Sequence, residues 1–151
     1  MVPNNNNTDI KKTMSPQKKD WLSRMRPVAL EVINEEDKLL EKHKNLPPWV
    51  LAAPHNKNNF KYHTAIKAFY ICVYNADIVG CRWWFGKFKD RSLKHLEFIE
   101  ECNKPMTALS MKSGKIVEEI TGQDNVYVDA ATKIKKLFLA MEKILTCLEK
   151  D

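Results

Sequence analysis

The sequence predicts an all-α fold, a compact bundle of about five to six helices, and three observations support this prediction. The length of 151 residues suits one domain with its own core. The chain contains only four glycines, too few for the many tight turns of a β-sandwich or barrel. Apolar residues recur every three or four positions over 134–148, which is the spacing of one face of a helix.

The first fourteen residues are expected to form a disordered arm ahead of the helical domain. A run of four asparagines and two lysines leaves this segment little to bury. Ser15 and Pro16 then predict a helix start, because Ser is a favoured N-cap and Pro fits the first helical position. The predicted organisation is therefore a basic, Asn-rich arm over 1–14 and a single helical domain over 15–151.

Prolines divide the first part of this domain. Pro27 lies within an amphipathic pattern and predicts either a kink or the start of a second helix that runs to about His43. Pro47 and Pro48 then predict a non-helical break, because a proline pushes the residue before it towards an extended conformation.

The middle of the domain is expected to contain a central buried helix. Residues 60–85 are apolar on nearly every side, and Gly86 is a natural end for such a helix. Asp90 or Ser92 is then expected to cap a further helix that ends before Pro105.

Two interpretations of the segment 106–127 stay open from the sequence. One is a helix that is broken at Gly114 and ends at Gly122. The other is a small β-hairpin near 115–129. In both cases the last helix is expected to start at a cap provided by Asp129.

No motif of catalysis or cofactor binding occurs. The nearest match to a phosphate-binding loop, Gly80–Lys87, has five residues between its glycines instead of four, and Phe88 replaces the required hydroxyl. A nucleophile elbow, the zinc-protease pattern and the Cys-x-x-Cys spacing are all absent from the sequence. We therefore expect a protein that is not an enzyme and that has no cofactor and no metal site.

The sequence also predicts an intracellular location, in the cytoplasm or nucleus. The first fifteen residues have no apolar core of a secretory leader. The most apolar stretch, 66–85, contains Lys67, Asp77 and Arg82, which argues against a transmembrane segment. The four cysteines are then expected to be reduced.

The N-terminal 26 residues are strongly basic. They contain six cations against two aspartates, and so carry four of the six net positive charges of the chain. Such a region suits contact with phosphates, where binding releases counterions, but it is equally typical of a solubilising tail. The cations are Lys11, Lys12, Lys18, Lys19, Arg24 and Arg26.

A second basic segment, Arg82–Arg91, interleaves cations with aromatic residues. This pattern is typical of sites where bases stack on rings and cations meet the phosphate backbone. The alternative is a buried helix end anchored by its aromatic side chains, since adjacent tryptophans on a helix point about 100° apart. The cations are Arg82, Lys87, Lys89 and Arg91, and the aromatic residues are Trp83, Trp84 and Phe88.

Two functions follow as hypotheses. The first is non-specific binding of nucleic acid through these residues, within a homo-oligomer or a larger assembly; the composition resembles that of viral or nucleoprotein-complex subunits. The second is a protein-interaction module that binds a partner helix or self-associates, with Trp49 and the Trp83–Phe88 cluster as contacts. Binding of the basic first helix to an anionic membrane is a third alternative.

Overall fold

The computed structural model describes the backbone of residues 14–110 and 117–150, and the side chains of residues 14–101 and 126–150. Within these ranges the chain is all helical and contains no strand, which confirms the all-α prediction. The helices are α2 (Pro16–Lys44), α3 (Pro48–Leu51), α4 (Pro54–Tyr74), α5 (Ile78–Ser110) and α6 (Val117–Glu149). The predicted arm lies, except for Met14, outside the described residues.

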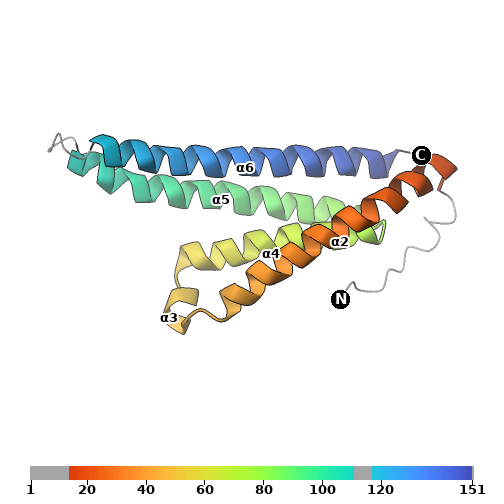
Figure 1. Cartoon of the computed structure of the whole chain (residues 1–151), viewed down its shortest axis with the longest axis horizontal. Helices are drawn as coiled ribbons and strands as arrows, with labels where there is room; N and C mark the ends of the chain where they lie inside the picture. Colours follow the sequence, from red (N-terminus) through yellow and green to blue (C-terminus); the bar gives the residue numbers. More distant parts are fainter. Residues whose placement is uncertain (1–13, 111–116, 151) are drawn as a thin grey trace.

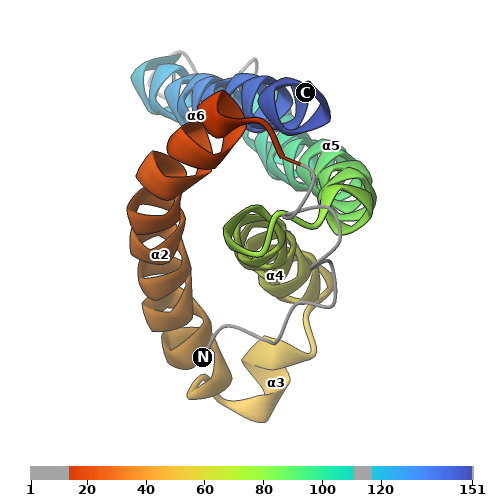
Figure 2. The same ribbon diagram turned by 90° about the vertical axis from the view of Figure 1, so that its right-hand side faces the viewer.

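Helix α4 occupies the centre of the molecule. It packs against α2 on one side and α5 on another, and α6 lies along α5 (Figures 1 and 2). The short helix α3 forms a corner between α2 and α4 (Figure 1). The start of α2 lies beside the end of α6, whereas the far ends of α5 and α6 project beyond α4 as a helical pair (Figure 1).

Helix α2 begins where the sequence predicts and then continues further than expected. The backbone N–H of Lys18 donates to Ser15 Oγ at 3.2 Å, so Ser15 is the N-cap. The helix runs through Pro27 to Lys44, and the expected helix start at Pro27 is therefore wrong. Pro27 is exposed, so the carbonyl that its missing N–H leaves free can accept from water.

The predicted central helix over 60–85 is divided by a turn, and its first part is the buried helix α4. Ala76 adopts a left-handed backbone conformation with φ 56°, which ends α4. Asp77 Oδ1 accepts from the backbone N–H of Gly80 at 3.0 Å and so caps α5. The Asp77 N–H in turn donates to the Cys72 carbonyl at 2.8 Å, which closes the turn.

The expected boundaries further along the chain are also replaced by one long helix. Gly86 does not end a helix, Asp90 and Ser92 do not start one, and α5 continues through Pro105. Ser92 Oγ instead donates to the Phe88 carbonyl within the helix at 2.7 Å. Packing along α4 and α6 holds α5 together across these local stop signals.

The last helix, α6, covers much of the segment for which the sequence left two interpretations open. It starts at Val117 and runs through Gly122 and Asp129, so the hairpin near 115–129 does not form and neither residue ends or starts a helix. The expected break at Gly114 lies outside the described residues. The pairing of α6 with α5 explains the continuity, because it covers the apolar stripe of α6 over much of its length.

The core lies between α4, the inner faces of α2 and α5, and the C-terminal half of α6. Its largest fully buried side chains are Phe69, Phe88, Ile66, Met141, Leu148, Val73 and Cys81. Among the described helices, none combines the length and apolar character needed to cross a membrane.

The two glycines of α5 respond in opposite ways to the same substitution. A Cβ at Gly80 would lie 2.6 Å from Cys72 Sγ and even closer to the capping carboxylate of Asp77. A Cβ at Gly86 would meet nothing within 4 Å. We expect Gly80→Ala to lower the free energy of unfolding by about 1–3 kcal/mol. Gly86→Ala should raise it by about 0.5–1 kcal/mol, because alanine restricts the unfolded chain and favours helix.

Urea unfolding of the two variants beside the wild-type chain measures both changes. Shifts of the two variants in the same direction would contradict this description of the α4–α5 turn.

Candidate functional site

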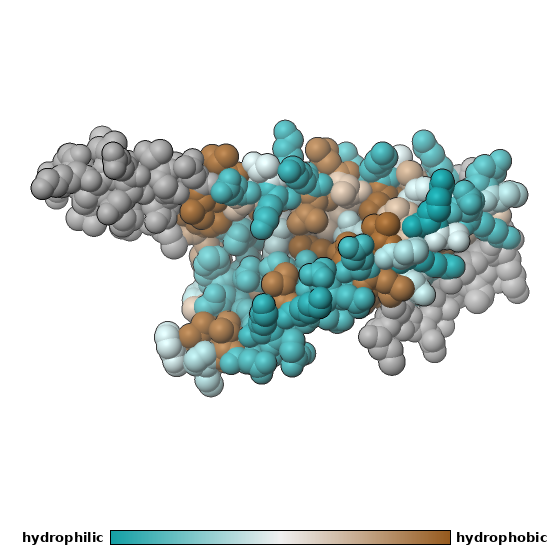
Figure 3. Space-filling model, viewed as in Figure 1, coloured by the Kyte–Doolittle hydropathy of each residue, from teal (hydrophilic) through white to brown (hydrophobic). Residues whose placement is uncertain are grey.

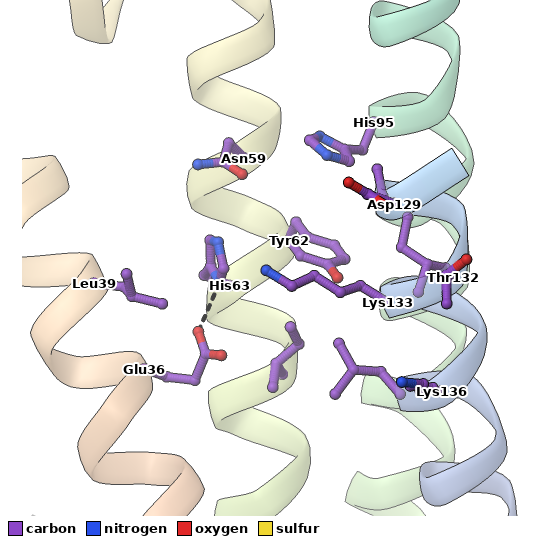
Figure 4. A pocket seen from close by; sticks show the side chains of 14 residues that line it. Glu36, Leu39, Asn59, Tyr62, His63, His95, Asp129, Thr132, Lys133 and Lys136 are labelled. Atoms are coloured by element: carbon purple, nitrogen blue, oxygen red, sulfur yellow. Dashed lines mark hydrogen bonds and ion pairs between the residues drawn. The ribbon is translucent and has the colours of Figure 1, made fainter. Parts of the chain in front are cut away.

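A groove of about 830 Å³ separates α2 from α6 (Figure 4). The helices α2 and α6 close on each other at one end of the molecule and diverge towards the other, and apolar side chains are visible between them (Figure 3). Side chains of α4 and α5 form the floor. The residues that face the groove include Glu36, Leu39, Tyr62, His63, Ile66, His95, Asp129, Lys133, Ile134, Lys136 and Leu137.

The floor of the groove is apolar and aromatic. Ile66 is buried at its base, and the ring of Tyr62 stacks on Phe88 below it with 5.6 Å between ring centroids. The ring of His95 stacks on Tyr62 at the same centroid distance. Leu39 contributes from α2 and is 45% exposed, so this wall offers apolar surface to solvent. A ligand with an apolar face would remove this surface from water.

The two walls carry opposite charges. On the α2 wall, Glu36 points towards α4 and meets His63 (Figure 4). On the α6 wall, Lys133 and Lys136 lie one turn apart, and the side chain of Lys133 extends across the groove towards α4 (Figure 4). Asp129 lies at the end of the lysine wall (Figure 4). The α2 wall therefore carries one mostly buried carboxylate, and the α6 wall carries two lysines and one aspartate.

The contact between Glu36 and His63 joins α2 to α4. Glu36 Oε2 accepts from His63 Nδ1 at 2.7 Å, and both side chains are mostly buried. A short bond of this kind between a carboxylate and an imidazole N–H is stronger than a bond between neutral groups. It fixes the position of the α2 wall relative to the floor.

Burial in the floor favours the uncharged forms of Tyr62 and His95. Burial, and then the nearby Glu36 carboxylate, raise the pKa of Tyr62 to about 12, so its hydroxyl stays protonated. Burial, and then His55 and His63, lower the pKa of His95, so its imidazole is neutral at pH 7. His95 Nδ1 is buried and has no hydrogen-bond partner among the described residues.

The titratable side chains that line the groove are His, Glu, Asp, Lys and Tyr. No serine or cysteine faces the described groove, and the hydroxyl of Thr132 on its rim donates to the Val128 carbonyl at 2.8 Å. Within the described residues, no group of three or more His, Cys, Asp or Glu side chains could hold a metal ion. What the groove offers is an apolar floor, oppositely charged walls and a neutral imidazole.

The cations predicted in the first helix are spread around it. Lys18 is buried, and Arg26 is engaged within the chain, with its Nε donating to the Tyr74 carbonyl at 3.1 Å. Arg24 forms an exposed ion pair with Asp20 at 3.4 Å, and Lys19 is exposed. The other two predicted cations, Lys11 and Lys12, lie outside the described residues.

The cations of α5 also fail to form one continuous track. Arg82 pairs with Glu149 of α6 at 3.4 Å, while the ammonium groups of Lys87 and Lys89 lie over the rings of Trp83 and Phe85 at 4.8 and 4.9 Å. At about 100° per residue, Arg91 lies on the opposite side of the helix from Arg82. One phosphate backbone could not contact all four cations along this helix, and nucleic-acid binding stays a prediction.

The predicted aromatic contacts divide into buried and exposed residues. Phe88 is completely buried in the core, so it is not accessible for stacking on a base. Trp84 is half-buried and packs against the same core. For these two residues, the interpretation as anchors of a buried helix is the one that fits. Trp83 and Trp49 are exposed, at 59% and 78%.

Sequence reasoning did not find the groove as a site. Its walls and floor come from four helices, and Glu36 and Lys133 are almost a hundred residues apart. The one visible signal is a row of lysines along one side of the last helix, which includes Lys133 and Lys136. That row indicates a face of the helix but says nothing of what lies opposite.

Comparisons with known proteins give no match: no family model, no curated protein and no solved structure is similar to this chain. The case for a function therefore depends on the geometry of the groove.

The lowered pKa of His95 predicts a loss of stability in mild acid. The unfolded chain binds a proton at this histidine near pH 6.5, whereas the folded chain resists it until a lower pH. The free energy of unfolding should therefore be unaffected by His95 above about pH 7 and fall as the pH drops through 6.5 towards the folded-state pKa. His95→Phe, which keeps an aromatic ring against Tyr62, should make this fall shallower.

Urea unfolding of the wild-type chain and His95→Phe between pH 7.5 and pH 5 measures the two slopes. Equal slopes would show that His95 titrates alike in the folded and unfolded chains.

Proposed function

We propose that this protein is a protein-interaction module whose groove binds an amphipathic helix of a partner protein. The observation that carries the proposal is the apolar floor of the groove, bordered by the exposed Leu39 on α2 and by the lysines of α6. A helix with one apolar face docks in such a groove through side chains at positions i, i+3, i+4 and i+7.

The size of the groove supports a helix of about three turns. Such a helix is about 16 Å long and 10 Å across, and half of its volume is roughly 600 Å³. The groove holds about 830 Å³, so it can take the inserted half of such a helix together with its side chains. A helix seated there would lie against α2, α4 and α6 and cover Leu39, Tyr62 and Leu137.

The charges of the walls define the partner further. Lys133 and Lys136 favour acidic side chains along the flank of the partner helix that faces α6. Glu36 is mostly buried and already accepts from His63, so the opposite flank of the partner helix meets the exposed Leu39 and is expected to be apolar. The partner is thus an amphipathic helix with an acidic edge, and the charges fix which way its flanks face.

Phosphate backbones fit this groove less well than a helix does. Glu36 and Asp129 both face the groove and would repel phosphates. The apolar floor would contribute little to a phosphate contact, whereas it supplies most of the area that a helix would bury. Protein binding is for these reasons the better supported of the two hypotheses.

An intracellular assembly is the setting that we propose for this module. Cys72, Cys81 and Cys147 are free thiols, which suits a reducing compartment. A hydrogen bond with Cys72 and burial raise the pKa of the Cys81 thiol, so this residue acts as a core side chain and not as a nucleophile. Self-association of the chain stays a prediction.

Selection from a displayed library of three- to four-turn amphipathic helices tests the proposal directly. We expect enriched peptides to share an apolar face and an acidic edge. Their affinity should fall at least tenfold for the chain carrying Lys133→Glu and Lys136→Glu, because two attractions become repulsions. Leu39→Glu should abolish binding, because it places a charge on the apolar wall.

Leu139→Glu is the matched control, since Leu139 is similarly exposed, at 52%, but does not face the groove. Binding that Leu139→Glu weakens as much as Leu39→Glu would overturn the assignment, as would a library without enriched acidic-edged helices.

A further inference from the structure

The corner around α3 lies within a long segment without acidic residues. Residues 42–76 contain five lysines and no Asp, Glu or Arg, so they carry a formal charge of +5 in a chain of +6. The lysines are Lys42, Lys44, Lys57, Lys61 and Lys67. Lys67 pairs with Asp37 of α2, which leaves four lysines around the α3 corner.

The corner also presents the most exposed tryptophan of the described residues. Trp49 is 78% exposed and Leu46, at the start of the same corner, is 38% exposed. Helix α3 lies at an outer corner of the molecule, and apolar side chains are visible there (Figures 1 and 3). Large apolar side chains at such a tip lose contact with water only if another phase or molecule covers them.

The cations gather beside this tip. A shallow hollow of about 320 Å³ is floored by the apolar side chains of Leu51 and Phe60. Its rim consists of His43, Lys44, Lys57 and Lys61, which come from the end of α2 and the start of α4. The hollow lies against α3, because Leu51 forms part of its floor, so the basic rim and the exposed Trp49 both belong to the α3 corner.

The tip is held rigidly in place. Pro47 and Pro48 restrict the backbone before α3, and the side chain of Asn56 donates to the Val50 carbonyl at 2.8 Å. The rings of His43 and Phe60 pack at 5.1 Å between centroids and join α2 to α4 beneath it. A rigid tip loses little conformational entropy when it inserts into a ligand.

We propose that the α3 corner docks the protein on an anionic membrane surface. Trp49 and Leu46 insert into the headgroup region, and Lys44, Lys57 and Lys61 contact lipid phosphates and acidic headgroups. A membrane fits better than a protein partner because the exposed apolar residues lie at an outer corner, and a deformable bilayer can accept such a corner. This site is separate from the groove and does not depend on the proposed helix binding.

The combination of two weak attractions makes the docking reversible. Each lysine near an anionic surface raises the affinity about fivefold, so three lysines together account for about a hundredfold. Insertion of the tryptophan ring contributes about tenfold more. Binding should therefore need acidic lipid and should weaken with salt.

Co-sedimentation of the full chain with vesicles tests this proposal. We compare vesicles of phosphatidylcholine alone with vesicles that contain a third of phosphatidylserine, at low and physiological salt. We expect binding to the acidic vesicles only. Trp49→Ala should reduce it about tenfold, whereas Trp83→Ala, at the other well-exposed tryptophan, should leave it unchanged.

The lysines are tested in the same way. Neutralising Lys44, Lys57 and Lys61 to Gln should reduce binding about a hundredfold. The control is a chain with Lys133 and Lys136 changed to Gln, which alters the groove and leaves the corner intact. Far-ultraviolet circular dichroism of each variant checks that the helices are retained.

Three outcomes would overturn the proposal: no binding to acidic vesicles at low salt, equal binding to neutral vesicles, or binding that the corner variants retain in full. In the last case, neutralising the exposed Lys19 and Arg24 shows whether the basic first helix binds the vesicles. None of these outcomes bears on helix binding in the groove, which is measured with peptides.

Discussion

The structure depends on the need to bury helix α4 on more than one side. Its residues are apolar nearly all round, and Ile66, Phe69 and Val73 are removed from water by α2 and α5. Because α6 packs on α5, it reaches α2 only at the end where Met141 and Leu148 join the core. Towards the other end the two outer helices diverge, and part of α4 stays uncovered between them. The groove is thus a consequence of three helices, α2, α5 and α6, covering a central helix unequally.

The kinds and faces of the helices could be predicted from the sequence better than their ends. The apolar periodicity identified the buried central helix and the last helix, whereas Pro27, Gly86 and Gly122 were each read as boundaries and lie inside helices. Tertiary packing outweighs the roughly 1–3 kcal/mol that one glycine or proline costs a helix. The break that does occur separates α4 from α5, and only the short polar residues Asn75 and Asp77 mark it in the sequence. Asp77 ends the apolar run because its hydrogen bonds close the turn and cap α5.

The candidate sites were less predictable, because each depends on relations between helices. Local composition identified Arg82 and Arg91 as neighbours in a basic segment, but the helical rotation puts them on opposite sides of α5. Composition could have identified the basic segment around α3, since the absence of acidic residues over 42–76 is visible in the sequence. The exposure of Trp49 at its tip and the pairing of Glu36 with His63 required the fold.

The first turns of α4 show how a single segment serves several surfaces. Asn58 faces the interior, where its side-chain amide donates to the Arg91 carbonyl at 3.0 Å. Phe60 and Lys61 face the α3 corner, and Tyr62 and His63 face the groove. Because successive residues turn by about 100°, neighbours in sequence belong to different surfaces. The first turns of α4 therefore contribute to the core, to the α3 corner and to the groove at once, although these surfaces are separate.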